Sequence, residues 1–109
     1  MSGQYAVYVT EPAANDIAKS LAYIATELHN PRASAKLLAD IAQRIRSLSS
    51  HPERFRMLPM SPWRERGYHS VSVRSYIIVY KVDAEGTSVF VSRVFHSLQN
   101  WESMLDSLS

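Results

Sequence analysis

The strongest fold signal in the chain is Thr87–Trp101, TSVFVSRVFHSLQNW, which predicts a strand followed by a turn into a last helix. Strict alternation would put two sets of side chains on opposite faces of this strand: Val89, Val91, Arg93 and Phe95 on one, and Phe90, Ser92, Val94 and His96 on the other. Both faces would be largely apolar, as is typical of a central strand that is covered on part of each side. Arg93 and His96 lie near its end, so we expect a chemical or recognition site there first.

Two further strands are expected just before this one. Residues 67–73 alternate valine with serine, and residues 76–82, YIIVYKV, form a nearly continuous apolar run that is typical of a buried strand. Arg74-Ser75 is short enough for a hairpin, and residues 83–86 predict a second turn. Residues 67–97 therefore predict a three-strand antiparallel meander.

The amino-terminal third predicts one strand and two helices. Residues 4–10, QYAVYVT, are rich in β-branched and aromatic residues, which favours a strand. Thr10-Glu11-Pro12 indicates a helix start with proline at the first helical position. Asn30 and Pro31 are expected to cap and open a second helix with almost no loop between the two. One apolar stripe is expected on each helix, formed by Ile17, Leu21, Ile24 and Leu28 and by Leu38, Ile41, Ile45 and Leu48.

So short a connection predicts an antiparallel helical hairpin that covers one face of the sheet. After the meander, Trp101, Met104, Leu105 and Leu108 fall at helical spacing, which predicts a short amphipathic helix anchored on the sheet by Trp101. The expected fold is therefore α+β in a single domain, residues 1–109: a strand, an α-helical hairpin, the three-strand meander that completes a four-strand sheet, and a short C-terminal helix.

Positive charge is concentrated in the middle of the chain. The net charge is only +2. Seven arginines nevertheless lie between residues 44 and 74, against Glu53 and Glu65 alone: Arg44, Arg46, Arg54, Arg56, Arg64, Arg66 and Arg74. Arginine makes forked contacts with phosphates and carboxylates, so a polyanion or an acidic protein is one expected partner. A solvated face that aids solubility is the alternative. Residues 52–65 carry three prolines and predict a long ordered loop.

Composition excludes several classes of protein. The chain has no cysteine, which removes disulfides, thiolate nucleophiles and zinc sites that need sulfur. No apolar run approaches the roughly 20 residues of a membrane span, and no secretory signal pattern opens the chain. We expect a soluble, cytoplasmic protein without metal or cofactor.

Several motifs, taken in order, are similar to those of a known family. They are YxVxxTxxAxxDI at residues 5–17, Tyr23-Ile24, Gly67-Tyr68, IIVYKVD at residues 77–83 and RVFHSLQN at residues 93–100. Across nearly the whole chain the sequence resembles the RelE/ParE superfamily, the toxins of bacterial type II toxin–antitoxin modules. The strand that ends in arginine, two apolar residues and histidine resembles the ParE and plasmid-stabilisation branch more than the RelE branch. The resemblance implies a cognate antitoxin as partner, with a possible hetero-oligomer.

The resemblance implies two alternative activities. A ParE-like toxin inhibits DNA gyrase by binding, and the candidate residues for contact with target or antitoxin are then Arg64, Arg66, Arg74 and Trp101. A RelE-like toxin is an endoribonuclease that cuts messenger RNA on the ribosome, and the candidate catalytic residues are then His96, Arg93 and His69. The ParE-like activity is favoured because Ile77 occupies a position where the nuclease branch often carries arginine, and His69 one where it carries lysine. A third possibility is a member that binds its antitoxin but has lost toxicity.

The three candidate catalytic residues also have structural interpretations. His96 can be a hydrogen-bonded residue at the end of its strand that anchors the carboxy-terminal segment. Arg93 can form an ion pair with Asp16 or Glu27 on the covering helices. His69 can be an exposed strand residue without a chemical role.

Overall fold

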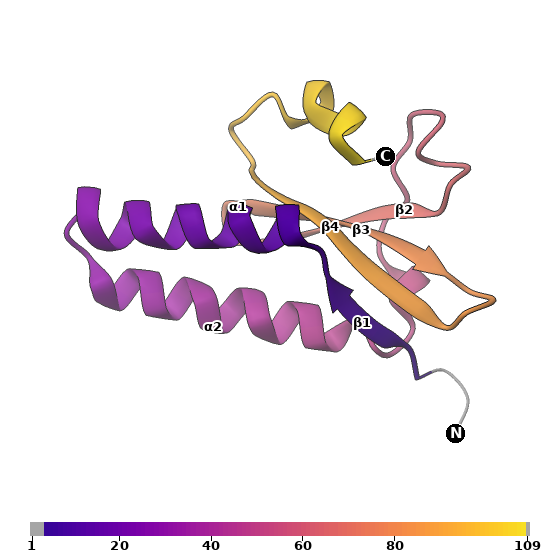
Figure 1. The fold of residues 1–109 in the computed structure, drawn as a ribbon, viewed down its shortest axis with the longest axis horizontal. Coiled ribbons are helices and arrows are strands. Elements are labelled where there is room, and N and C mark those ends of the chain that lie inside the picture. Colours follow the sequence, from indigo (N-terminus) through magenta and orange to yellow (C-terminus); the bar gives the residue numbers. More distant parts are fainter. Residues whose placement is uncertain (1–3, 109) are drawn as a thin grey trace.

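The computed structural model describes residues 4–108 and has the element order that the sequence predicts (Figure 1). The elements are β1 (Ala6–Val9), α1 (Glu11–Ala22), a π-helical turn (Tyr23–Glu27), α2 (Pro31–Ser47), a 3-10 turn (Pro52–Arg54), β2 (Tyr68–Val73), β3 (Tyr76–Asp83), β4 (Ser88–His96) and a C-terminal 3-10 helix (Trp101–Leu108). The fold is α+β, as predicted. Within residues 4–108, no helix has the length and apolar character that a membrane span requires.

One four-stranded sheet organises the molecule, in the order β1-β4-β3-β2. The three strands of the predicted meander pair antiparallel, whereas β1 pairs in parallel with the first half of β4. β4 is therefore an inner strand, as its apolar faces indicated. β1 is shorter than predicted because Gln4 forms only an isolated bridge, with Ser50.

Side-chain caps fix where both helices begin. Thr10 Oγ1 accepts a hydrogen bond from the Ala13 amide and donates one to the carbonyl of Val91, which ties the start of α1 to β4. α1 begins at Glu11, so Pro12 occupies its second position rather than the first. Asn30 Oδ1 accepts from the Ala33 amide at 3.0 Å, which confirms the predicted cap of α2.

The antiparallel hairpin of α1 and α2 covers one face of the sheet and builds the larger core (Figure 1). The predicted stripe of α2 is wrong by one residue at its start: Leu37 is buried and Leu38 is 46% exposed. Ser34 explains the difference because its hydroxyl donates to the carbonyl of Leu21 in α1 at 2.9 Å. That contact turns the Ser34 side of α2 inward, and Leu37 and Ile41 follow it on the next turns.

The opposite face of the sheet is covered by the long loop and the C-terminal helix. Its smaller core consists of Leu58, Tyr68, Val79, Phe95, Leu105 and Leu108. Trp101 stacks on Phe95 with ring centroids 6.2 Å apart, as expected for the anchor of the last helix. The predicted amphipathic character is confirmed, although the helix is 3-10 rather than α.

A β-bulge in β4 breaks the alternation that the sequence predicted. Val79 pairs with Arg93 and Tyr80 with Val91, so Ser92 is an extra residue. After the bulge, Val94 joins the core under the helices. Arg93 and Phe95 turn to the opposite face, and the Arg93 guanidinium lies 4.9 Å from the centroid of the Phe95 ring.

Candidate functional site

Arg93 is held by partners on two other elements. Its Nε donates to Asp16 Oδ2 at 2.7 Å, and its Nη2 donates to Asp16 Oδ1 at 2.9 Å. Its Nη1 donates to Ser107 Oγ at 2.7 Å. The hydrogen bond from Arg93 to the Asp16 carboxylate raises the pKa of the guanidinium. Asp16 also accepts from the Val94 amide, so the predicted ion pair with Asp16 is present and joins α1, β4 and the C-terminal helix.

His96 is a hydrogen-bonded residue at the end of β4. Its Nδ1 accepts from the Leu98 amide at 3.1 Å, so a neutral ring carries its proton on Nε2. Its backbone amide donates to Gln99 Oε1 at 2.8 Å. The ring meets Tyr76 edge to face, with centroids 5.0 Å apart. These contacts hold the turn that leads to the C-terminal helix.

His69 lies inside the protein, so its prediction as an exposed strand residue is wrong. Only 4% of it is exposed. Its Nδ1 lies 3.0 Å from the carbonyl of Phe55, and its ring stacks on Tyr80. The cause is the long loop, because Met57 pairs with His69 and covers the outer edge of β2.

The fold does not bring the three candidate catalytic residues together. On β3, His69 is opposite Tyr80 and His96 is opposite Tyr76. Four residues of strand separate these two positions, which corresponds to about 13 Å. Arg93 lies on the other face of the sheet. Within residues 4–108, no three His, Asp or Glu side chains cluster as metal ligands.

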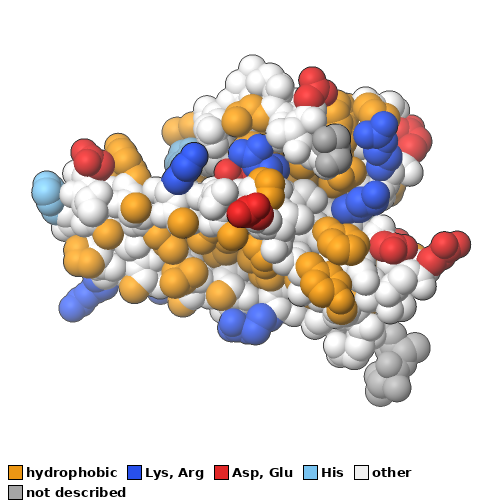
Figure 2. Space-filling view, viewed as in Figure 1, with side chains coloured by type: hydrophobic (Ala, Val, Ile, Leu, Met, Phe, Trp, Pro, Cys, Tyr) orange, Lys and Arg blue, Asp and Glu red, His pale blue; other side chains and the backbone are white. Residues whose placement is uncertain are grey.

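The candidate binding residues also lie apart. Arg64 and Arg66 are exposed in the turn before β2, and Arg66 borders a hollow with Lys81 near the β3–β4 turn. Arg74 lies at the other end of β2, in its turn to β3. Trp101 is partly buried against Phe95. On the face that Figure 2 shows, lysine and arginine side chains are scattered, and a broad hydrophobic area lies over α1 and α2.

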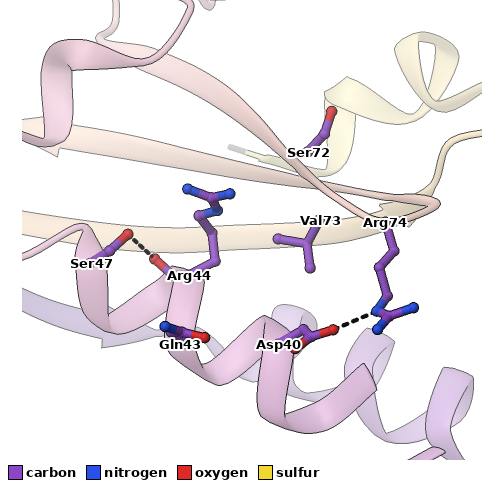
Figure 3. A pocket seen from close by; sticks show the side chains of 7 residues that line it. All are labelled: Asp40, Gln43, Arg44, Ser47, Ser72, Val73 and Arg74. Atoms are coloured by element: carbon purple, nitrogen blue, oxygen red, sulfur yellow. Dashed lines mark hydrogen bonds and ion pairs between the residues drawn. The ribbon is translucent and has the colours of Figure 1, made fainter. Parts of the chain in front are cut away.

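A polar hollow of about 400 Å³ lies between α2 and β2. Its lining consists of Asp40, Gln43, Arg44, Ser47, Ser72, Val73 and Arg74 (Figure 3). Arg74 Nε donates to Asp40 Oδ2, and this hydrogen bond lowers the pKa of the Asp40 carboxyl. Figure 3 shows the Arg44 side chain rising from α2 toward β2. The hollow therefore presents two guanidinium groups and one carboxylate.

Comparison with known proteins identifies the family. Residues 7–101 match the family described as "ParE toxin of type II toxin-antitoxin system, parDE". The chain belongs to the ParE toxin family. It is thus a type II toxin–antitoxin toxin of the RelE/ParE superfamily, as its motifs indicated. A comparison with curated proteins finds no significant match.

Solved structures share the fold of this ParE family member. The chromosomal ParDE toxin–antitoxin system of P. aeruginosa aligns with a TM-score of 0.69 at 17% identity, over 85% of this chain and 96% of that one. The RelBE2 toxin–antitoxin complex of Mycobacterium tuberculosis aligns with a TM-score of 0.62 at 27% identity, over 88% and 94%. A mutant of the E. coli toxin RelE in the free state gives 0.50 at 20%, over 96% and 93%. The first and third likenesses concern the fold alone.

In this ParE family member, the sequence patterns did not single out Arg44 or Ser72, which line the polar hollow. Arg44 counted only as one of seven arginines in the basic segment. Asp40 and Arg44 stand four residues apart and so share one face of α2, which was an available signal. Their position beside β2 depends on the rotation of α2 that Ser34 imposes, and no local pattern encodes that rotation.

Proposed function

We propose that the protein is a ParE-like toxin that acts in the cytoplasm, inhibits DNA gyrase by binding it, and is neutralised by a cognate antitoxin. The observation that carries the proposal is the state of Arg93, the cation near the end of β4. Three of its nitrogens donate to Asp16 and Ser107. A guanidinium held in this way is poorly placed to stabilise charge on a phosphate.

The chemistry of RNA cleavage strengthens the preference for binding. Cleavage at a phosphodiester needs a base for the 2′-hydroxyl, cations for the developing charge and a donor for the leaving oxygen. Here His69 is buried, Arg93 is paired, and His96 lies far from His69 along the sheet. Of the three candidate catalytic residues, His96 alone is left as an unpaired proton donor or acceptor that reaches the surface.

A binding mode of action needs exposed groups instead of a convergent active site. Arg64 and Arg66 are exposed on one turn and are our candidates for contact with the target. Arg74 and Trp101 remain candidates for contact with target or antitoxin. The antitoxin is supported by the family and by structures of similar toxins that are described as toxin–antitoxin systems or complexes.

A supercoiling assay tests the proposal. We expect the purified protein at micromolar concentration to inhibit DNA supercoiling by gyrase, and the double variant Arg64→Glu/Arg66→Glu to inhibit it less. Arg32→Glu, an exposed charge reversal at the start of α2, is the matched control and should inhibit like the unmodified chain. Unchanged supercoiling with the unmodified protein would remove the gyrase proposal.

An endoribonuclease is the second candidate function. Two observations favour it: the 27% identity to a chain of the RelBE2 complex, and the partial exposure of His96, whose Nε2 has no hydrogen-bond partner within residues 4–108. Under this alternative, induction would produce cleaved messenger RNA that disappears in His96→Ala. Intact messenger RNA during growth arrest, together with full toxicity of His96→Ala, would exclude it.

A further inference from the structure

β1 forms one edge of the sheet, and only its start is covered on the outer side. The amides of Ala6 and Thr10 donate to carbonyls on the β4 side. The amide of Tyr5 donates the other way, to the carbonyl of Ser49 just after α2, and Figure 1 shows the end of α2 beside the start of β1. Because backbone direction alternates along a strand, the amides and carbonyls of residues 7 and 9 also face away from β4.

Val7 and Val9 leave four backbone groups open at this edge. Within residues 4–108, neither their amides nor their carbonyls have a backbone partner on the outer side. Residues 4–10 carry no charge and no proline, and β1 pairs with β4 in unbroken register. Charges, prolines and bulges are the devices that keep an edge strand from pairing with another chain. The edge of β1 has none of them and therefore favours the addition of a further strand.

An exposed aromatic pair adjoins this edge. Tyr8 and Phe90 are partners in the strand register, and their rings stack with centroids 5.4 Å apart. They alternate with Val89 and Val91 of the core under the helices, so they lie on the opposite face of the sheet. Tyr8 is 52% exposed. The apolar surface thus extends to the outermost strand, where a neighbouring strand would cover it.

We propose that β1 pairs antiparallel with β1 of a second copy of this chain, so that the two four-stranded sheets join into one. One register uses all four open groups, with Val7 of each copy opposite Val9 of the other. It places the two-fold axis at Tyr8. The two Tyr8 residues then form a non-hydrogen-bonded pair, in which side chains approach most closely. Tyr8 and Phe90 of both copies would form one row of aromatic rings.

The two ends of β1 limit the pairing and carry opposite charges. Ser49 covers the edge at Tyr5, and α1 begins at Glu11, so the open edge is short. In the proposed register Glu11 of one copy lies opposite Tyr5 of the other. A cation stands close to that position, because Arg54 donates to the carbonyl of Ser50, the neighbour of Ser49. Antiparallel pairing therefore brings the exposed carboxylate of each copy toward an exposed guanidinium of the other.

The charges favour a second copy over a nucleic acid as the occupant. The hollow beside Phe90 is lined by Arg66 and Lys81 but also by Asp83 and Glu85, which leaves no surplus of positive charge for a phosphate backbone. A short uncharged edge that is closed at both ends suits an identical edge better than a longer extended segment. The inference concerns neither gyrase nor an antitoxin, so it goes beyond the proposed function and can fail or hold independently of it.

Sedimentation equilibrium of the full-length protein tests the inference. We expect a reversible dimer between about 1 and about 300 µM, because an interface built on so short a strand is small and weak. Tyr8→Lys should raise the Kd of the dimer at least tenfold, about 1.4 kcal/mol, because like charges then meet at the two-fold axis. Tyr23→Lys is the matched control: Tyr23 is 56% exposed and lies on the helical hairpin, so the Kd should stay within a factor of about two.

Hydrogen exchange identifies the edge that pairs and needs no variant. In the unmodified protein, the amides of Val7 and Val9 should exchange more slowly at high than at low protein concentration. The Ser72 amide is the internal control and should not change. It faces outward from β2, the opposite edge, by the same parity that directs the Ser70 amide to the carbonyl of Arg56.

Several outcomes would overturn the inference. They are a chain that stays monomeric at every concentration, a Tyr8→Lys variant that dimerises as well as the unmodified chain, and protection of the Ser72 amide in place of Val7 and Val9. The inference is also overturned if Val7 and Val9 become protected only when a single-stranded oligonucleotide or a different protein is added.

Discussion

The end of β4 and the edge of β2 each pair an arginine with an aspartate, but the two pairs differ in surroundings. The side chains of Arg93 and Asp16 are each 16% exposed, and Arg93 has a further partner in Ser107. The side chains of Arg74 and Asp40 are 48% and 33% exposed, and one hydrogen bond joins them. Burial and the number of partners, rather than residue type, therefore distinguish an arginine that stabilises the fold from one that is free to contact another molecule.

The largest effect is expected from Asp16→Ala. The change leaves the Arg93 guanidinium half-buried without its anion and removes the acceptor of the Val94 amide. Breaking such a pair from one side costs about 3 kcal/mol of unfolding free energy. Denaturant titration would measure it, with the exposed Asn15→Ala on the same helix as control. If Asp16→Ala lowers the unfolding free energy no more than Asn15→Ala does, the Arg93–Asp16 pair is no more important for stability than an exposed pair.

Arg93→Lys separates the effect of charge from that of geometry, because lysine keeps the positive charge but lacks the planar guanidinium group. A lysine cannot reproduce the two parallel hydrogen bonds to Asp16. We expect a loss of about 1.5 kcal/mol, less than for Asp16→Ala, because the carboxylate keeps a cation nearby. If both variants unfold at the same denaturant concentration, geometry rather than charge sets the stability of this region.

Ser107→Ala tests how much the C-terminal helix depends on Arg93. Ser107 is exposed, so the loss of the two hydrogen bonds of its hydroxyl, from Arg93 and to the Met104 carbonyl, should cost only about 0.5 kcal/mol. Faster hydrogen exchange confined to residues 101–108 is the expected readout. Faster exchange throughout the sheet would mean that the helix stabilises the whole fold through this contact.

The smallest effect is expected from Asp40→Asn at the edge of β2. The pair is exposed to solvent, so the midpoint of unfolding should not change measurably at neutral pH. The hydrogen bond from Arg74 lowers the pKa of Asp40 in the folded state. Any contribution of the pair is thus present above the unfolded pKa of about 4 and is lost as the pH falls below it. A clear destabilisation at pH 7 would place Arg74 with Arg93 among the structural arginines.

Sequence patterns were sufficient for the elements of the fold and for one tertiary contact. Alternation, the hairpin turn and the cap at Asn30 predicted the meander and the helical hairpin, because each depends on a few neighbouring residues. The Arg93–Asp16 pair was among the predicted alternatives, although the face deduced for Arg93 was wrong. The arginine reaches Asp16 from the other face of the sheet.

Failures occurred where distant residues determine the geometry. The bulge at Ser92 moves Val94 to the opposite face from the one predicted, and nothing in VSRVF signals an extra residue. His69 is buried by a loop more than ten residues upstream, through the Phe55 carbonyl. The hollow between α2 and β2 depends on two distant contacts. Residues 56–58 pair with β2 only as far as Ser70, and the hydrogen bond from Ser34 to Leu21 sets the rotation of α2. These features depend on tertiary packing, which overrides local pattern.

The parallel pairing of β1 with β4 has a consequence for synthesis of the protein. Ala6 pairs with Ser88 and Val9 with Val91, so β1 has no neighbouring strand until residues 88–91 have left the ribosome. The Asp16 carboxylate likewise has no ion-pair partner until Arg93 has been synthesised. A nascent chain halted before β4 would expose the apolar side of the helical hairpin and lack the inner strand of its sheet. This topology therefore delays completion of the sheet until β4 has been synthesised.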